Sequence, residues 1–439
     1  MRCRFILLMA ALSALPVGAQ ETLTLDDALA LAEASNRTLQ GAHLAVDQAA
    51  DRLGLAKARR LPLLSLESQV SSLLRPVEFS LSRGQLGEYP GTGPLPGSDI
   101  TIDSDPSLIG RVTGRLALPL TQQRRLGLGV KYSMAGLESE QAGLGAQRLA
   151  IRSEVRRNYR ALLQAQDGLA ASRSTQQFLQ ELERSVTQAV AVEAAMKADL
   201  LDVQANLAAE EARALMLRNA ADTARERINV MVGKPIDTAW SPAPISEPSA
   251  LPSLVEARAR ALAGRPELRR ARLTAKQAEL GWRIKRSESI PDISLALTYD
   301  GFHNVELLPE RIMQAGVIVS WEPFSFGRRK REISERNHAR RQAELAAQEA
   351  EEATAVDVDA AYRRAQEADA IVRAQQAAEA AAIERFRVTD NRYRVGASTL
   401  RDLLDAQSRL TNARTTRLDA ENARAEARRD LERAMGGEL

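Results

Sequence analysis

The sequence predicts a mainly α-helical protein with a small β part, built from two tandem repeats of long helical hairpins and paired strands. Two observations lead to this fold class. The phrase DLLDVQ at 199–204 returns as DLLDAQ at 402–407, which marks an internal repeat. In addition, long proline-free helical segments are separated by short segments in which apolar and polar residues alternate. A chain of 439 residues is long enough to hold both repeats.

The repeat extends beyond this phrase at two fixed intervals. At 203 residues, the matching pairs are Val155–Val358, Tyr159–Tyr362 and Gly233–Gly436. Upstream the interval is 229 residues, and LPLLSL at 61–66 matches IPDISL at 290–295. The change of interval indicates an insertion in the first repeat. We expect the first repeat over 20–233 and the second over 254–439. Residues 234–253 are rich in proline and predict a semi-extended linker.

The first 19 residues predict a secretory signal peptide, here 1–19. Arg2 and Arg4 give a basic start, residues 5–15 are apolar, and small residues precede a cleavage site after position 19. Its removal would take away Cys3, the one cysteine, and lower the net charge from +3 to about +1. We therefore expect an exported protein without disulfides and without a nucleic-acid partner.

In each repeat a helix stops at a proline and strands follow. Pro62 and Pro291 end helices because proline lacks an amide donor and disfavours helical geometry in its predecessor. Strands are expected at about 63–75, 107–121, 291–300 and 313–323, where alternate residues are apolar. The insertion at 75–106 contains a Gly/Pro-rich stretch at 88–106, which predicts a polar loop in water.

Each repeat continues into a very long helix. Residues 136–192 contain no proline and carry apolar residues at three- and four-residue steps, and 328–392 repeat the pattern. At 1.5 Å per residue the first of these helices would be roughly 85 Å long, which suits a tube or a coiled coil rather than a compact domain. Bends near 193–199 and 393–400 would turn each helix back into a second one.

Four strands of this length raise the possibility of a membrane sheet. Beyond the signal segment, no stretch has the ~18 continuous apolar residues of a membrane helix. A membrane barrel needs at least about eight strands, and an open sheet edge is not tolerated in lipid. Two chains would supply eight strands and three would supply twelve. The alternative is a small antiparallel sheet on a soluble coiled coil.

The repeated phrase places acids beside each predicted bend. Asp402 and Asp405 are three residues apart and share one helix face, while Leu403 and Leu404 turn elsewhere. Gly396 precedes them and can adopt the positive φ of a sharp bend. The simplest interpretation is a solvated acidic helix start, which the helix dipole favours.

Signatures of chemistry are absent from the sequence. There is no H-E-x-x-H, C-x-x-C or G-x-S-x-G motif, and GTGPLPG at 91–97 lacks the G-K-[ST] of a phosphate-binding loop. The three histidines have no ligand spacing. We therefore expect neither an enzyme nor a cofactor or metal site.

The combination of features resembles the TolC family of outer-membrane efflux proteins. The signal segment, tandem halves, strand pairs after proline and long hairpins carry the likeness over the mature chain. YRVGASTLRDLLDAQ at 393–407 is similar to that family's second hairpin tip, where a Tyr-x-x-Gly turn precedes an Asp-x-x-Asp pair. The resemblance implies a homotrimer among outer-membrane lipids of a Gram-negative bacterium. Its four strands per chain would form a 12-stranded β-barrel, continued by an α-helical barrel across the periplasm.

The resemblance also implies a function and partners. Such a duct exports small molecules or proteins from the periplasm or from an inner-membrane pump of RND or ABC type, docked through a periplasmic adaptor. Three chains would place Asp402 and Asp405 in an acidic entrance ring, a device that favours cations. The remaining entrance residues implied are Asp199, Asp202 and Tyr393, whose hydroxyl would bond Asp199 in the closed state. The implied docking residues are Arg394, Val395, Gly396 and Ser398.

Two departures from the family pattern concern the tips. Glu193 stands where the first tip should carry glycine, so we expect that bend to turn elsewhere, at Ala194–Ala198. Ser398 stands where some members have an arginine that locks the closed entrance. Other function classes are a periplasmic adaptor and a soluble structural coiled coil. An adaptor would need one hairpin between β-rich domains, and a coiled coil does not explain four symmetric strands.

Two further features lie after the last predicted strand. The basic run 328–331 is a candidate for anionic lipid headgroups, with a solvated helix start as the alternative. Trp321 is a candidate for an interfacial aromatic belt, with core packing as the alternative.

Overall fold

The computed structural model describes residues 22–72, 74, 77–104, 108–245, 250–305 and 309–437. The predicted signal peptide lies outside them. The chain forms two compact units. The hairpin unit comprises the described parts of Met1–Val46, Ser139–Ala271 and Ala346–Leu439, and the sheet unit comprises those of Asp47–Glu138 and Arg272–Leu345. Each repeat contributes to both units.

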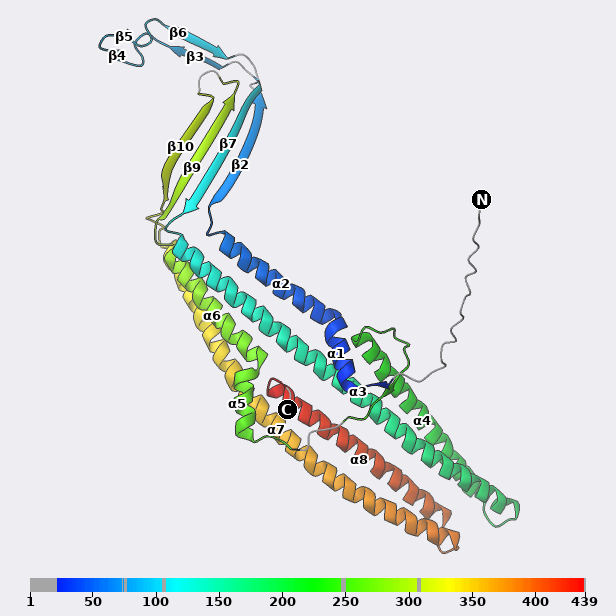
Figure 1. Cartoon of the computed structure of the whole chain (residues 1–439). Coiled ribbons are helices and arrows are strands. Elements are labelled where there is room, and N and C mark those ends of the chain that lie inside the picture. The colour runs from blue at the N-terminus through cyan, green and yellow to red at the C-terminus, as the bar shows by residue number, and fades with distance from the viewer. Residues whose placement is uncertain are drawn as a thin grey trace, which may run out of the picture. The chain divides into compact units, whose positions relative to one another are not determined.

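The helices repeat at the two intervals found in the sequence. In the first half they are α1 (Leu25–Ser35), α2 (Arg37–Ala58), α3 (Gln123–Ala191) and α4 (Lys197–Met231). In the second half they are α5 (Leu254–Gly264), α6 (Pro266–Ser287), α7 (Arg328–Arg394) and α8 (Leu400–Ala434). The starts of α1 and α5 differ by 254 − 25 = 229 residues, and those of α4 and α8 by 400 − 197 = 203. The duplication is therefore present in the fold as well as in the sequence (Figure 1).

The short helices α1 and α5 each end at a residue with an extended backbone conformation. Asn36 after α1 has ψ 121°, and Arg265 after α5 has ψ 117°. Pro266 explains the second break, because a residue before proline avoids helical geometry. Asn36 explains the first, because its side-chain oxygen accepts from the Thr38 amide at 2.9 Å and starts a new helix.

The main sheet has four antiparallel strands in the order β10-β9-β7-β2. They are β2 (Leu63–Ser72), β7 (Leu108–Pro119), β9 (Asp292–His303) and β10 (Arg311–Ser320). Each repeat supplies one hairpin, and β7 pairs with β9 to join the two hairpins. Within the described residues, β2 and β10 each pair on one side only.

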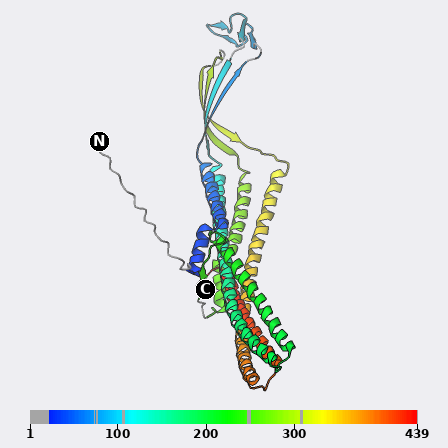
Figure 2. The ribbon, with the colours of Figure 1, turned by 90° about the vertical axis from the view of Figure 1, so that its right-hand side faces the viewer.

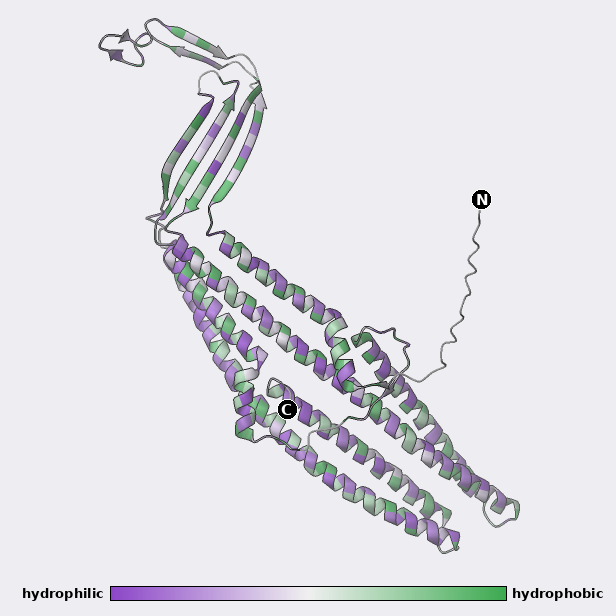
Figure 3. Ribbon diagram, in the orientation of Figure 1, coloured by the Kyte–Doolittle hydropathy of each residue, from purple (hydrophilic) through white to green (hydrophobic). Residues whose placement is uncertain are grey.

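The register gives this sheet one apolar and one polar face. Leu116 lies between Leu64 and Leu297, and in the next row on that face Gly114 lies between Leu66 and Tyr299. On the opposite face, Arg115 lies between Ser65 and Thr298. Figure 3 shows this alternation of hydrophobic and hydrophilic residues along the strands. The two-faced strands predicted from the sequence are therefore confirmed.

The insertion, expected as a polar Gly/Pro-rich loop at 88–106, contains short strands. It contains β4 (Glu88–Tyr89) paired with β5 (Gly93–Pro94), and β6 (Ile100–Ser104) paired with β3 (Val77–Leu81). Gly91 and Gly93 adopt φ values of 90° and 78°, which lets the chain turn tightly between β4 and β5. The Gly/Pro-rich stretch therefore includes strands of two short antiparallel pairs.

The proline-rich segment 234–253, expected as a semi-extended linker, is held in place at Trp240. Trp240 is 1% exposed and stacks on Tyr159 at 6.0 Å between ring centroids. The indole of Trp240 donates to the Asn229 amide oxygen at 2.8 Å. The next residues form β8 (Ser241–Pro242), which pairs in parallel with β1 (Thr22–Leu23). The segment is extended, but an aromatic anchor fixes part of it to the hairpin unit.

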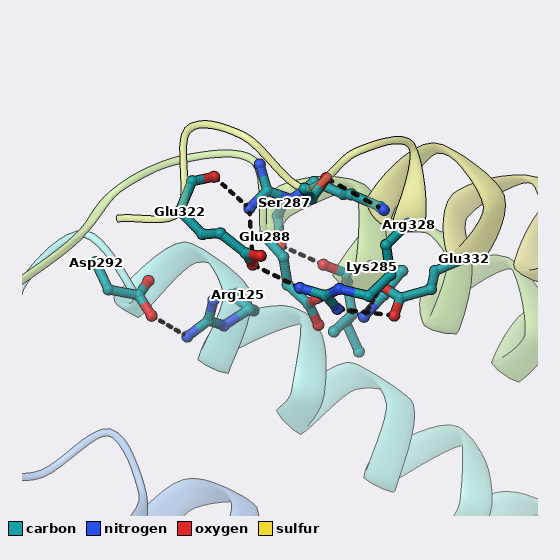
Figure 4. A network of polar contacts seen from close by, with 11 residues as sticks. Arg125, Lys285, Ser287, Glu288, Asp292, Glu322, Arg328 and Glu332 are labelled. Carbon is teal, nitrogen blue, oxygen red and sulfur yellow. Dashed lines mark hydrogen bonds and ion pairs between the residues drawn. The ribbon is translucent and has the colours of Figure 1, made fainter. Parts of the chain in front are cut away.

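Ion pairs hold the helices to the strand ends within the sheet unit (Figure 4). Arg125 of α3 binds Asp292, the first residue of β9, at 2.9 Å. Lys285 of α6 binds Glu332 of α7 at 2.9 Å and Glu288 at 2.7 Å. Hydrogen bonds from Lys285 and Arg328 lower the pKa of Glu332 below its ordinary value. These pairs fix the positions at which the strands leave the helices.

Tyr159 offers a direct test of the buried network. Its hydroxyl donates to the Leu23 carbonyl at 2.7 Å and accepts from the Ala243 amide at 2.7 Å. Tyr159→Phe should lower stability by about 1–3 kcal/mol, because a buried amide loses its partner. The measurement is thermal unfolding in detergent. Tyr362→Phe, the repeat equivalent at the edge of another core cluster, should shift the melting temperature much less. Equal shifts would contradict this assignment.

Candidate functional site

The two predicted tips lie in the hairpin unit, where α3 turns into α4 and α7 turns into α8. The turns use the same backbone bonds. The Ala194 amide donates to the Ala189 carbonyl at 2.8 Å, and the Ala397 amide donates to the Arg392 carbonyl at 2.7 Å. Figures 1 and 2 both show the tips at the same end of the unit. Residues from distant parts of the sequence therefore meet there.

Glu193 corrects the expectation for the first bend. The turn does not move to Ala194–Ala198, because Glu193 itself adopts φ 57° at the position where Gly396 adopts φ 73° in the second tip. A side chain in this left-handed region costs roughly 1–2 kcal/mol relative to glycine. The first tip therefore makes the same turn as the second, at the expense of local strain.

A small apolar core joins all four helices close to the tips. Its buried members are Leu182, Val186, Val203 and Leu403. Phe178 of α3 and Phe386 of α7 meet edge to face beside it, with ring centroids 5.3 Å apart. Leu403 of the repeated phrase is 1% exposed, whereas Asp402 and Asp405 face solvent. The division of faces predicted for this phrase is confirmed.

Asp402 and Asp199 begin their helices in equivalent ways. The Asp402 carboxylate accepts from the Thr399 amide at 3.0 Å and from the Thr399 hydroxyl at 2.7 Å, and the Asp402 amide donates back to that hydroxyl at 3.2 Å. The Asp199 carboxylate accepts from the Met196 amide at 3.0 Å. Both acids thus satisfy backbone donors that the first helical turn leaves unpaired.

The electrostatics of the tip follow from these bonds. Hydrogen bonds from the Thr399 hydroxyl and amide lower the pKa of Asp402, and Arg392 lowers it further. The pKa of the Tyr393 phenol is raised by burial first and then by the charge of Asp199. Tyr393 and Asp199 are therefore neighbours, but no hydrogen bond between these two described side chains is present here.

The other residues predicted for the tips lie near Asp402, Asp199 and Tyr393. Asp405 pairs with Arg409 at 2.8 Å on the exposed side of α8, and Asp202 is exposed at the equivalent position of α4. Arg394 pairs with Asp390 at 3.0 Å. Val395 is 78% exposed, and the Ser398 hydroxyl donates to Asp402 at 3.2 Å.

Sequence reasoning missed Thr399 as a functional neighbour of Asp402. Thr-x-x-Asp directly before an apolar run is the signature of a helix N-terminus, so residues 399–402 carried a readable signal. It also missed the exposed apolar side chains of the first tip, Val192 and Met196, which are 74% and 69% exposed. Together with Val395 they give both tips an apolar surface.

A two-faced sheet whose outer strands each pair on one side only among the described residues, together with duplicated helical hairpins, matches the fold of solved outer-membrane channels. The model of the outer membrane efflux protein family matches residues 28–234 and 257–437. The chain belongs to the outer membrane efflux protein family. A search of curated proteins found no significant match.

Solved structures share the fold over nearly the whole chain. The outer membrane protein VceC of Vibrio cholerae aligns with a TM-score of 0.77 and 18% identity, covering 94% of this chain and 96% of that one. The CmeC outer membrane channel of Campylobacter jejuni aligns at 0.78 and 16%, covering 99% and 94%. The open state of the Neisseria gonorrhoeae MtrE channel aligns at 0.76 and 19%, covering 94% and 89%.

The family and these neighbours are efflux proteins and channels rather than enzymes, which agrees with the expectation from the sequence. In the described part of the chain, no helix combines the length and the apolar character needed to cross a membrane.

The two acids of DLLDAQ should respond differently to removal. Asp402→Ala should speed amide hydrogen exchange several-fold at the start of α8, because Thr399 loses its partner. Asp405→Ala is the matched control, since its carboxylate pairs with an exposed arginine and should leave exchange unchanged.

The pH dependence of this cap has a defined sign. Because the folded-state pKa of Asp402 lies below its ordinary value, its stabilisation is present above the ordinary value and is lost as pH falls through the lowered one. Exchange in the wild type at pH 5 should therefore match that at pH 7 after correction for the intrinsic rate. Early fraying near pH 5 would disprove the cap.

Proposed function

We propose that three copies of this chain form an exit duct in the outer membrane, with a 12-stranded barrel and periplasmic helical hairpins. The observation that carries the proposal is the four-stranded sheet, whose apolar face is exposed along its length. Leu66 is 77% exposed, Met313 70% and Val319 62%. Such a surface is unfavourable in water and favourable against lipid.

The open edges support assembly into a ring. In lipid, unpaired amides and carbonyls on β2 and β10 would each cost several kcal/mol. The four strands alternate in direction, so β10 of one copy can pair antiparallel with β2 of the next. Head-to-tail pairing of identical copies closes by rotation, and three copies give an even-numbered barrel.

The opposite sheet face suits an aqueous lumen. Arg111 binds Asp300 on the neighbouring strand at 2.9 Å, and the Thr113 hydroxyl donates to the same carboxylate at 2.7 Å. Charged and hydroxyl groups on this face would be costly in lipid but are solvated in a water-filled channel. The two faces together favour a polar conduit over a soluble sheet.

The acidic tips suit the periplasmic entrance of such a duct. Threefold symmetry would bring three copies of Asp405 and Asp202 into rings, which favour cations. Tyr393, partly buried beside Asp199, is placed to brace a closed entrance. The apolar tip residues Val192, Met196 and Val395, with Arg394 and Ser398 beside them, are the proposed contacts for a periplasmic adaptor serving an inner-membrane pump. Small molecules or proteins delivered by the pump would pass outward.

The membrane sheet is tested by charge on each face of one strand. Val317→Arg, on the apolar face of β10, should destabilise the trimer by about 2–4 kcal/mol near mid-membrane. Gln314→Arg, on the polar face of the same strand, should be tolerated. The measurements are light scattering in detergent and the heat stability of the oligomer. A wild-type chain that is monomeric in detergent, or equal sensitivity of the two faces, would refute the proposal.

The entrance role is tested by single-channel recording of purified trimers. Asp405→Asn combined with Asp202→Asn should weaken cation selectivity and reduce block by multivalent cations, because the ring loses its charge. These two acids are preferred to Asp402, whose removal also uncaps α8. Asp237→Asn, exposed in the segment before Trp240, is the control. Unchanged selectivity in the double variant would remove both acids from the pore wall.

A further inference from the structure

A basic groove lies in the sheet unit between the start of α3 and the end of α6. It has a volume of about 580 Å³, and its main lining residues are Arg124, Leu128, Trp282, Arg283, Arg286 and Ile290. None of the lining residues is acidic. Three guanidinium groups therefore share a concave surface with a large aromatic ring and two aliphatic side chains. Arg283 is paired with Glu279 on its own helix at 2.5 Å.

The other two groove arginines differ from their sequence neighbours. Arg125 binds Asp292, and Lys285 binds Glu332 (Figure 4). Arg124 and Arg286, the adjacent residues, make no ion pair with a carboxylate in the described chain. One cation of each doublet is thus used to hold the helices to the strands, and the other faces the groove.

Trp282 organises the cations around it. The Arg286 guanidinium lies 5.6 Å from the Trp282 ring centroid, and Arg340 of α7 lies 5.3 Å from it. Stacking on an aromatic face orients a guanidinium while leaving its edge donors free. Arg124 lies in the first turn of α3, where the helix dipole disfavours a cation. An anion in the groove would relieve both the like-charge repulsion and this dipole effect.

The groove lies beside the first residues of the membrane sheet. Ile290 is two residues before β9, and the Thr121 hydroxyl, at the other helix-strand junction, donates to the Pro291 carbonyl at 2.8 Å. At the same end of the sheet, β10 leads into Trp321, Phe324 and Phe326, which are 59%, 81% and 104% exposed. Exposed aromatic residues next to membrane strands are typical of the lipid–water interface.

We infer that the basic groove binds the headgroup of an anionic phospholipid, such as a phosphatidylglycerol, in the periplasmic leaflet. The inference rests on the proposed membrane location of the sheet. Arg124 and Arg286 donate to the phosphate oxygens, and arginine matches this geometry with paired donors. Leu128 and Ile290 contact the glycerol and first acyl carbons. The bound lipid fixes the depth at which the barrel sits.

The basic run 328–331 is a weaker candidate for the same ligand. Arg328 is paired with Glu322 at 2.5 Å and Glu332 at 2.9 Å, and Arg329 donates to the Glu322 carbonyl at 2.9 Å. Half of the run is therefore occupied by structural bonds, and hydrogen bonds to two carboxylates raise the pKa of Arg328. Lys330 and Arg331 are exposed.

The test is native mass spectrometry of the full-length trimer in detergent, titrated with dioleoylphosphatidylglycerol or dioleoylphosphatidylcholine. The wild type should retain the anionic lipid in preference to the zwitterionic one. Arg124→Gln/Arg286→Gln should bind it about 30-fold more weakly, the ratio expected for two arginines at an anionic surface. Arg124→Lys/Arg286→Lys should fall between the two. Glycerol phosphate at equal concentration should compete poorly, since it lacks the acyl chains.

Controls separate the possible failures. Arg173→Gln/Arg184→Gln has the same charge change on exposed α3 positions of the hairpin unit and should bind like the wild type. Equal loss in that control, or in Lys330→Gln/Arg331→Gln, would overturn the groove as the site. Unchanged lipid binding in the groove variant would also overturn the groove as the site. So would loss of its trimers with lipid binding per chain retained, because the groove would then be a contact with a second copy. A wild-type chain that needs no detergent and binds neither lipid would instead overturn the membrane location.

Discussion

The hydrogen-bonding demand of strand edges is the constraint on which the rest of this structure depends. The four-stranded sheet has one exposed apolar face and two edges, β2 and β10, that lack a partner on one side among the described residues. An apolar face alone would be satisfied by any covering surface. Unpaired backbone donors and acceptors in lipid are satisfied only by further strands. The duplication supplies two hairpins per chain, and β7 pairing with β9 makes them one sheet. In the proposed trimer, symmetric copies would pair with its two edges.

At the tips of the long hairpins a different set of backbone groups needs partners. The first amides of each helix have no helical carbonyl to which they can donate a hydrogen bond. Asp199 and Asp402 meet this demand with the same carboxylate geometry in both repeats. The acids of the repeated phrase therefore have two compatible uses. One member of each pair caps its helix, and the other, Asp202 or Asp405, is exposed and would contribute its charge to the proposed entrance. Strain at Glu193 shows that the turn position itself is held by the surrounding core.

The basic residues where helices meet strands also have two roles: some form ion pairs with carboxylates, and others, within the described residues, do not. Arg125, Lys285 and Arg328 are tied to carboxylates and define how α3, α6 and α7 meet the sheet. Arg124 and Arg286 lie beside them around Trp282, without such partners in the part of the chain that the structure describes. In the proposed membrane location, this surface would combine internal ion pairs, which fix geometry, with additional cations that meet an anionic leaflet.

The sequence by itself determined the duplication, the faces of the strands and the amphipathic phrase at each tip. These follow from local rules: period 2 in strands, period 3.6 in helices, and the effect of proline on its predecessor. Tertiary structure decided what local rules cannot. Glu193 turns as glycine would, because the core formed by Leu182, Val203 and Leu403 fixes both tips at one level. Trp240 anchors a segment whose prolines predicted only extension, because its partners Tyr159 and Asn229 are remote or on another element. An arginine such as Arg125 forms an ion pair only if another element places a carboxylate close to it. Composition does not determine that distance.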